Sequence, residues 1–195
     1  LSIRRQRQMC IRDRFNIINR RVNTDIARSM LKYCEQSVHK ALPIWSHMAN
    51  ENWCMIGYHS VSVLADAVAK GLPLDKEEVL KAMVSSSTIP YLDGTGEYME
   101  KGYVALDHNG SAASLTLEYA YDDWTIYHTA LLAGNRSVAD TYKKRAANYT
   151  NVFDTNMGYA RPRYADGRWK ENFNLLNTHG EGFIEGNALN YSFYV

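Results

Sequence analysis

The 195-residue sequence has no apolar run that approaches the roughly 18–20 residues of a membrane-spanning helix. It also has almost no net charge, +1 at pH 7. Because a surface that binds nucleic acid needs a clear basic excess, we do not expect a nucleic-acid partner. The three cysteines are odd in number and lack metal-ligand spacing, so they define no disulfide framework. Cys34 and Cys54 fall in apolar patterns and are predicted to be buried thiols.

Several catalytic signatures are missing as well. The sequence contains no HExxH motif, no phosphate-binding glycine loop and no convincing Ser–His–Asp arrangement. Strands do not alternate with helices, which argues against a Rossmann or TIM-type sheet. No signal peptide is visible, but the sequence does not start with methionine, so this says nothing about export.

Residues 1–14, LSIRRQRQMCIRDR, are crowded with arginine and have no apolar periodicity. They resemble the translated read-through of a sequencing adapter, so we expect a leader that is not native to the protein. A basic arm that binds a partner is the alternative. Residues 15–195 are then expected to be the central part of one domain that is cut at both ends.

Apolar periodicity predicts an all-α fold with long irregular loops. Asn23 or Thr24 would cap the first helix, with Ile26 and Val38 on its apolar face. Asp75 would start the third helix. The predicted helices cover about residues 24–39, 55–70, 75–85, 114–133 and 137–152, with a final one starting near Glu185 or Asn187, and residues 86–110 and 154–182 as loops.

The segment TLEYAYDDW, residues 116–124, places three carboxylates close together near the start of a helix. Glu118 and Asp122 are four residues apart and therefore share a helix face, about 5–6 Å apart at Cβ. Two such carboxylates repel when both are ionised, which favours protonation of one of them, as a general acid requires. A solvated acidic helix start is the alternative interpretation.

A second segment, HGEGFIEGN, combines oxygen ligands with glycines that let the backbone approach a ligand. Its polar side chains are His179, Glu181, Glu185 and Asn187. Carboxylate and amide oxygens suit Ca²⁺, although this is not the EF-hand pattern. A loop followed by an ordinary helix start explains the segment equally well.

A third segment, WSHMANENW, crowds Trp45, Asn50 and Glu51 around a predicted helix start. These side chains suit contact with a sugar, but an aromatic junction between helices is as good an explanation. His59 alone is better explained as a structural histidine than as a ligand.

Taken together, these segments resemble successive blocks of glycoside hydrolase family 92. The resemblance covers about residues 22–195 and is carried by several long motifs in the right order. The matching blocks are LPIWSHMANENWCMIGYHSVSVLADAVAKG, TLEYAYDDW, RAANYTNVFD, MGYARPRYADGRW and FIEGNALNYSFYV.

The resemblance implies a partial (α/α)6 toroid that belongs to a Ca²⁺-dependent, inverting α-mannosidase acting on mannose-containing glycans. It implies that Glu118 is the general acid. His179, Glu181 and Glu185 would contact the leaving-group sugar, and Asn187 and Glu185 would lie on the calcium side. Trp45, Asn50 and Glu51 would contribute to substrate binding. The resemblance favours α-1,2 linkages, but Gly180 separates His179 from Glu181 where α-1,2-specific members have adjacent His and Glu, so the linkage stays open.

An inverting glycosidase also needs a second carboxylate as base, and the resemblance places that residue after position 195. We therefore expect the chain alone to be inactive, and the complete protein to be periplasmic or secreted. Two alternatives are another (α/α)6 glycosidase, of the trehalase or glucoamylase kind, and a non-catalytic helical module that binds carbohydrate.

Overall fold

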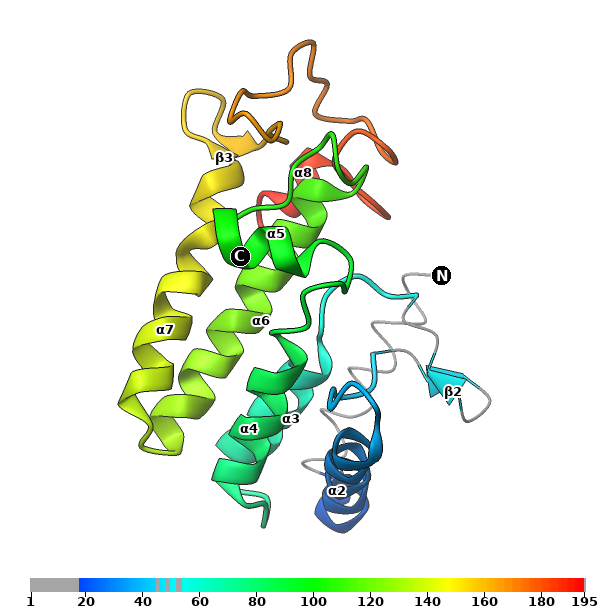
Figure 1. The fold of residues 1–195 in the computed structure, drawn as a ribbon, viewed down its shortest axis with the longest axis vertical. Coiled ribbons are helices and arrows are strands. Elements are labelled where there is room, and N and C mark those ends of the chain that lie inside the picture. The colour runs from blue at the N-terminus through cyan, green and yellow to red at the C-terminus, as the bar shows by residue number, and fades with distance from the viewer. Residues whose placement is uncertain (1–17, 45, 48–49, 52–53, 195) are drawn as a thin grey trace. The chain divides into compact units, whose positions relative to one another are not determined.

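The computed structural model describes residues 18–44, 46–47, 50–51 and 54–194 (Figure 1). These residues fold as two compact units. The first unit comprises the described residues up to Ser87 together with Thr125–Tyr142. The second comprises Thr88–Trp124 and the described residues from Lys143 onward. Most of the described chain is helical, which confirms the prediction of an all-α fold class. The expected leader, residues 1–14, lies outside the described residues.

Three helices form the first part of unit 1: α2 (Arg20–Gln36), α3 (Ser60–Ala69) and α4 (Lys76–Ser86). They pack against one another, and Leu31, Leu64 and Met83 are buried between them. A short antiparallel pair, β1 (Ser46–His47) and β2 (Asn50–Glu51), precedes α3. Asp75 caps α4 as predicted, because its carboxylate accepts hydrogen bonds from the backbone N–H groups of Glu77 and Glu78.

The start of α2 was predicted wrongly. The helix begins at Arg20, and the side chain of Asn19 caps it by accepting from the N–H of Val22. Asn23 and Thr24 are buried within the helix, where the Thr24 hydroxyl donates to the carbonyl of Arg20. The apolar face is also shorter than predicted, because α2 ends at Gln36 and Val38 is exposed.

The start of α3 also differs from the prediction, which placed it near Met55. Gly57 has a left-handed backbone, with φ of 79°, and this conformation interrupts the helical path. The helix begins at Ser60, whose hydroxyl donates to the carbonyl of Pro43. Cys54 precedes the turn and is exposed, so it is not the buried thiol predicted from the sequence, whereas Cys34 is buried as predicted.

The longest helix, α6 (Ala112–Leu132), and the next one, α7 (Arg136–Ala146), each run through both units. Gly134 ends α6: with φ of 76° it turns the chain back, so that its N–H and that of Asn135 bond to the carbonyls of Leu131 and Ala130. Asn135 then accepts from the N–H of Val138 at the start of α7.

Unit 2 adds five short elements around the first half of α6. These are α5 (Thr95–Lys101), the 3₁₀ helix η1 (Ala147–Val152), the antiparallel pair β3 (Phe153–Asp154) and β4 (Tyr159–Ala160), and α8 (Ala188–Tyr191). The predicted loop at 86–110 therefore contains a helix, and the predicted end of α7 is a 3₁₀ segment. The core of this unit is a cluster of buried side chains from α6, η1, β4, α8 and the loops: Tyr103, Ala105, Ala113, Leu117, Val152, Ala160, Phe183 and Ala188.

Candidate active site

Glu118 lies on the first half of α6 and is almost fully buried, with 7% of its surface exposed. One carboxylate oxygen, Oε1, accepts a hydrogen bond of 2.8 Å from the hydroxyl of Tyr191. Tyr191 is 73 residues further along the chain, at the end of α8. The structure thus brings the TLEYAYDDW segment and the C-terminal segment together at a single carboxyl group.

The C-terminal segment is attached to the start of α6 by backbone hydrogen bonds. The carbonyl of Gly182 accepts from the N–H groups of Ala113 and Ser114, at 2.9 and 3.1 Å. These N–H groups belong to the first turn of α6, and the helix itself offers no carbonyl acceptors for them. The N–H of Gly182 donates to Gly110, and that of Ile184 donates to the Ser114 hydroxyl. This attachment places the segment one turn before Glu118.

Helix α8 then carries the chain back toward the acid, and its red ribbon lies beside the start of α6 in Figure 1. Asn187 caps α8 by accepting from the N–H of Asn190, and Ala188 is buried in the core of unit 2. The Tyr191 ring packs against Phe183 with ring centroids 5.8 Å apart. Its hydroxyl reaches both Glu118 and the carbonyl of Ile184, the latter at 3.1 Å.

Aromatic rings surround this carboxyl group. Tyr194 lies 5.8 Å from the Tyr191 ring and 5.6 Å from the Tyr121 ring, measured between centroids. Burial, and then the negative charge of Glu118, raise the pKa of Tyr191 well above its ordinary value. The pKa of Tyr194 is raised for the same two reasons. Both phenols therefore stay neutral and can donate hydrogen bonds across the working pH range.

The other two carboxylates of the segment are fully covered. Asp123 accepts hydrogen bonds from the Tyr98 hydroxyl and from Nε of Arg145, both at 2.9 Å. Asp122, one turn beyond Glu118, is likewise 0% exposed. The carboxylates of this segment therefore differ in their surroundings. Glu118 keeps a small exposed area beside a hydroxyl, whereas Asp123 belongs to a buried ion pair that supports the fold.

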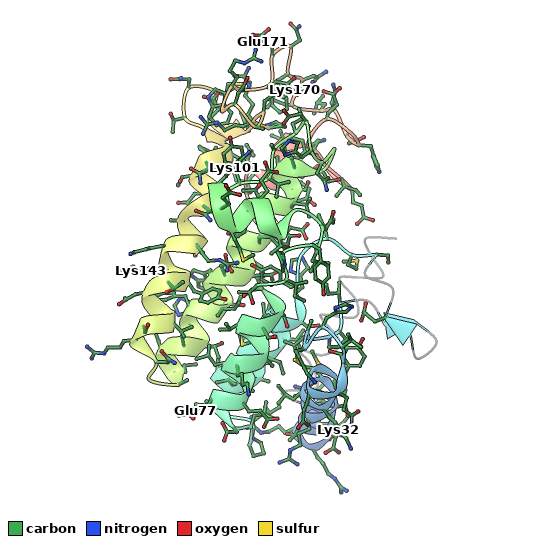
Figure 2. All side chains as sticks on the ribbon, viewed as in Figure 1. Lys32, Glu77, Lys101, Lys143, Lys170 and Glu171 are labelled. Carbon is green, nitrogen blue, oxygen red and sulfur yellow. The ribbon has the colours of Figure 1, made fainter. Side chains whose placement is uncertain are left out.

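The polar residues of HGEGFIEGN differ in exposure, backbone conformation and partners. His179 and Glu185 are exposed, and each has a left-handed backbone, with φ of 51° and 58°. Glu181 is half-buried and pairs with Nζ of Lys170 at 3.0 Å, on the irregular segment where Figure 2 labels Lys170 and Glu171. The Glu181 carboxylate is thus held by a lysine in this structure.

Asn187 and Glu185 do not form a complete calcium site by themselves. Within the described part of the chain, no three His, Cys, Asp or Glu side chains come together as metal ligands would. The side-chain oxygen of Asn187 already accepts the hydrogen bond that caps α8. Because Ca²⁺ takes about six to eight oxygen ligands, these residues would need several more from elsewhere.

The third segment belongs to unit 1. Trp45 lies outside the described residues, and Asn50 is described only as part of β2. Glu51 accepts a hydrogen bond from the N–H of Ile44 at 2.9 Å. His59 stands at the start of α3, where its carbonyl accepts from Ser62. A sugar-contacting role for Trp45, Asn50 and Glu51 stays a prediction.

The sequence motifs did not single out Tyr191, which bonds to Glu118, or Ser114, which bonds to the neighbouring segment. Tyr191 was recognised only as part of a matching block. Its position four residues after the cap residue Asn187 was an available signal, because it puts the hydroxyl one helical turn beyond the cap. No spacing rule relates residue 191 to residue 118.

Residues 10–195 match the family model described as the glycosyl hydrolase family 92 catalytic domain. The chain therefore belongs to this family, which confirms the resemblance drawn from the sequence blocks. It also decides against the trehalase-like and glucoamylase-like alternative. No match was found among the curated proteins. In the described residues, no helix is long and apolar enough to cross a membrane.

Solved structures agree with this assignment. The chain resembles the family 92 α-mannosidase BT3965 from Bacteroides thetaiotaomicron, solved in complex with mannoimidazole, with 38% identity and a TM-score of 0.89. The match covers 94% of this chain and 25% of that one. The inverting mannosidase BT2199 from the same species matches at 32% identity and a TM-score of 0.76, over 83% of this chain and 22% of that one. The chain thus spans about a quarter of the length of these enzymes.

Proposed function

We propose that this chain is part of the catalytic domain of an exo-acting α-mannosidase, and that Glu118 is its general acid. The observation that carries the proposal is the placement of Glu118: a nearly buried carboxyl group, held by Tyr191, on the helix that bears the family motif. Similarity to two mannosidases supports the substrate class, a terminal α-linked mannose of a glycan.

In this reaction Glu118 donates its proton to the glycosidic oxygen while the bond from that oxygen to the anomeric carbon breaks. Inversion requires a second carboxylate about 6.5–9.5 Å away, which activates water on the opposite face of the sugar. Asp122 is fully covered and so does not reach such a water in this structure. We propose that the base comes from a part of the domain beyond this chain, and that the chain contributes to an (α/α)6 toroid. The similarity to BT2199, an inverting mannosidase, supports the stereochemistry.

We propose that the complete enzyme depends on Ca²⁺, with Asn187 and Glu185 on the side of the ion. The resemblance supports this, and so do the exposed carboxylate and the amide oxygen in one glycine-rich segment. His179, Glu181 and Glu185 are proposed to contact the leaving-group sugar, with Trp45, Asn50 and Glu51 as further binding residues. An α-1,2 linkage is the favoured substrate. We propose a periplasmic or secreted location for the complete enzyme.

Replacing Glu118 with glutamine in the complete enzyme tests the proposal. The amide keeps the shape of the side chain but has no acidic proton. We expect kcat for an α-mannosyl disaccharide to fall by about 10²–10⁴, with KM changed much less. Glu100→Gln is the matched control, because it makes the same change at an exposed glutamate of α5 in the same unit. A Glu118→Gln variant with kcat near that of the wild type would refute the proposal.

A further inference from the structure

The Tyr191 hydroxyl lies between two oxygen atoms that compete for its single proton. Glu118 Oε1 is 2.8 Å away and the carbonyl oxygen of Ile184 is 3.1 Å away. A phenol has one proton to donate, so it bonds fully to one of these atoms at a time. The two acceptors differ in kind: a backbone carbonyl only accepts, whereas a carboxyl group accepts when ionised and donates when protonated.

This arrangement can satisfy both protonation states of Glu118. When Glu118 is protonated, its O–H donates to the Tyr191 oxygen, and the Tyr191 proton points to Ile184. When Glu118 is ionised, the Tyr191 proton turns toward the carboxylate and forms a charge-assisted hydrogen bond. The change needs only rotation about the phenolic C–O bond, so no heavy atom has to move.

The hydroxyl is held in this position from several sides. The Ile184 N–H bonds to the Ser114 hydroxyl at 3.2 Å, and the Tyr191 ring packs on Phe183. The Tyr191 N–H donates to the carbonyl of Asn187 within α8. Burial and the charge of Glu118 raise the pKa of Tyr191, while a hydrogen bond from Ser114 lowers it less. The phenol thus stays protonated, and it exchanges no proton with the acid.

We propose that Tyr191 is the positioning residue of the acid: its hydroxyl keeps the Glu118 carboxyl group oriented both before and after proton transfer. This inference rests on the proposed role of Glu118. During the reaction the Glu118 proton moves to the glycosidic oxygen, which takes the electron pair of the broken C–O bond. Tyr191 turns its own proton to the new carboxylate and neither gains nor loses one.

The test is Tyr191→Phe in the complete enzyme, measured with two substrates. One is an α-mannosyl disaccharide, whose sugar leaving group needs protonation, and the other is an aryl α-mannoside with an acidic phenol, which needs little. We expect kcat for the disaccharide to fall about ten- to a hundredfold, as for the loss of a hydrogen bond to a charged group. KM should stay nearly constant, and the aryl substrate should lose much less. The ratio of the two kcat values comes from one preparation and does not depend on the folded fraction.

Tyr103→Phe is the matched control. It removes a partly buried hydroxyl of the same unit that donates to the carbonyl of Tyr164 at 3.0 Å. We expect this variant to keep the wild-type ratio of kcat values. Two results would overturn the positioning role. One is an equal loss of kcat on both substrates in Tyr191→Phe, and the other is a change of the kcat ratio in Tyr103→Phe as large as that in Tyr191→Phe.

A parallel Glu118→Gln variant separates the two claims. If Glu118→Gln changes the ratio strongly and Tyr191→Phe does not, the positioning role is wrong and the proposed acid stands. If Glu118→Gln leaves the ratio unchanged, the acid role itself is wrong and the inference falls with it. A change in both variants, larger in Glu118→Gln, is the result expected.

Discussion

At the scale of single residues, the three carboxylates of TLEYAYDDW have the same chemistry but different partners. Asp123 is fully buried against a guanidinium group and a phenol, whereas Glu118 has the Tyr191 hydroxyl on one oxygen. The sequence spacing predicted that Glu118 and Asp122 share a helix face, and both lie on α6 as expected. It did not predict the division of roles, because Tyr98, Arg145 and Tyr191 are distant in sequence.

Removing the Asp123 carboxylate is expected to destabilise the chain strongly. In Asp123→Ala, the Arg145 guanidinium loses its buried partner, and the variant should lose about 3–5 kcal/mol of unfolding free energy. Urea denaturation followed by circular dichroism measures this change. Asp166→Ala is the control, because it removes an exposed partner of Arg168 and should have little effect. A small loss in Asp123→Ala would contradict a structural role for this ion pair.

At the scale of elements, the site depends on how the segment around Gly182 joins α6. Its backbone supplies partners for the first N–H groups of the helix. Apolar periodicity predicted the helices well, since one-sided burial leaves a clear pattern in the sequence. It missed α5, because short helices are set by caps and tertiary contacts rather than by periodicity. The final helix expected near Glu185 or Asn187 is present as α8, with Asn187 as its cap. It misplaced the starts of α2 and α3, where Asn19 and the left-handed Gly57 decide the boundary.

Two glycines of this segment differ in a way that can be measured. Gly180 and Gly182 both have positive φ, 73° and 94°. A Cβ at Gly182 would lie 2.1 Å from Cγ of Pro162, whereas one at Gly180 meets nothing within 4 Å. Gly180→Ala should therefore cost only about 1–2 kcal/mol of backbone strain. Gly182→Ala should cost clearly more and should also lower kcat by shifting Tyr191.

Thermal unfolding and disaccharide kinetics of the two variants check this prediction. Similar stability and similar kcat in both would show that the contact between Gly182 and Pro162 does not position the segment.

The β3–β4 turn gives a prediction about pH. A hydrogen bond from Arg161 lowers the pKa of Asp154 below its ordinary 3.8, with further help from the N–H groups of Asn156 and Met157. The unfolded carboxyl group therefore takes up a proton at higher pH than the folded one. This contribution to stability is present above the ordinary pKa and is lost as the pH falls through the folded pKa.

Acid titration of stability checks that sign. Between about pH 5 and pH 3, the free energy of unfolding should fall less steeply in Asp154→Asn than in the wild type. Arg161→Gln should flatten the same region, because it removes the group that lowers the pKa. Equal slopes in all three proteins would contradict the assignment.

At the scale of the whole molecule, the chain carries the proposed acid but covers only about a quarter of the length of the mannosidases that it resembles. The sequence blocks identified the family correctly, because several long motifs occurred in order. Several apolar side chains are exposed in the described part of the chain, including Leu131 at 48% and Leu132 at 47%. Such side chains are consistent with a surface that further helices of a toroid would cover.

The isolated 195-residue chain is therefore expected to release no mannose from α-mannosides. The complete enzyme should release it and should lose this activity with a calcium chelator. Reducing-sugar release by the two proteins, with and without added Ca²⁺, measures both effects. Robust turnover by the isolated chain would show that its own residues include the base.

The most direct test of the central claim is the dependence of kcat on the leaving group in a series of aryl α-mannosides. An enzyme that protonates the departing oxygen is only weakly sensitive to the pKa of the departing phenol. In Glu118→Gln, we expect the logarithm of kcat to fall steeply as that pKa rises, while the most acidic phenols still leave at rates near those of the wild type. Parallel lines for wild type and variant would contradict the claim that Glu118 is the general acid.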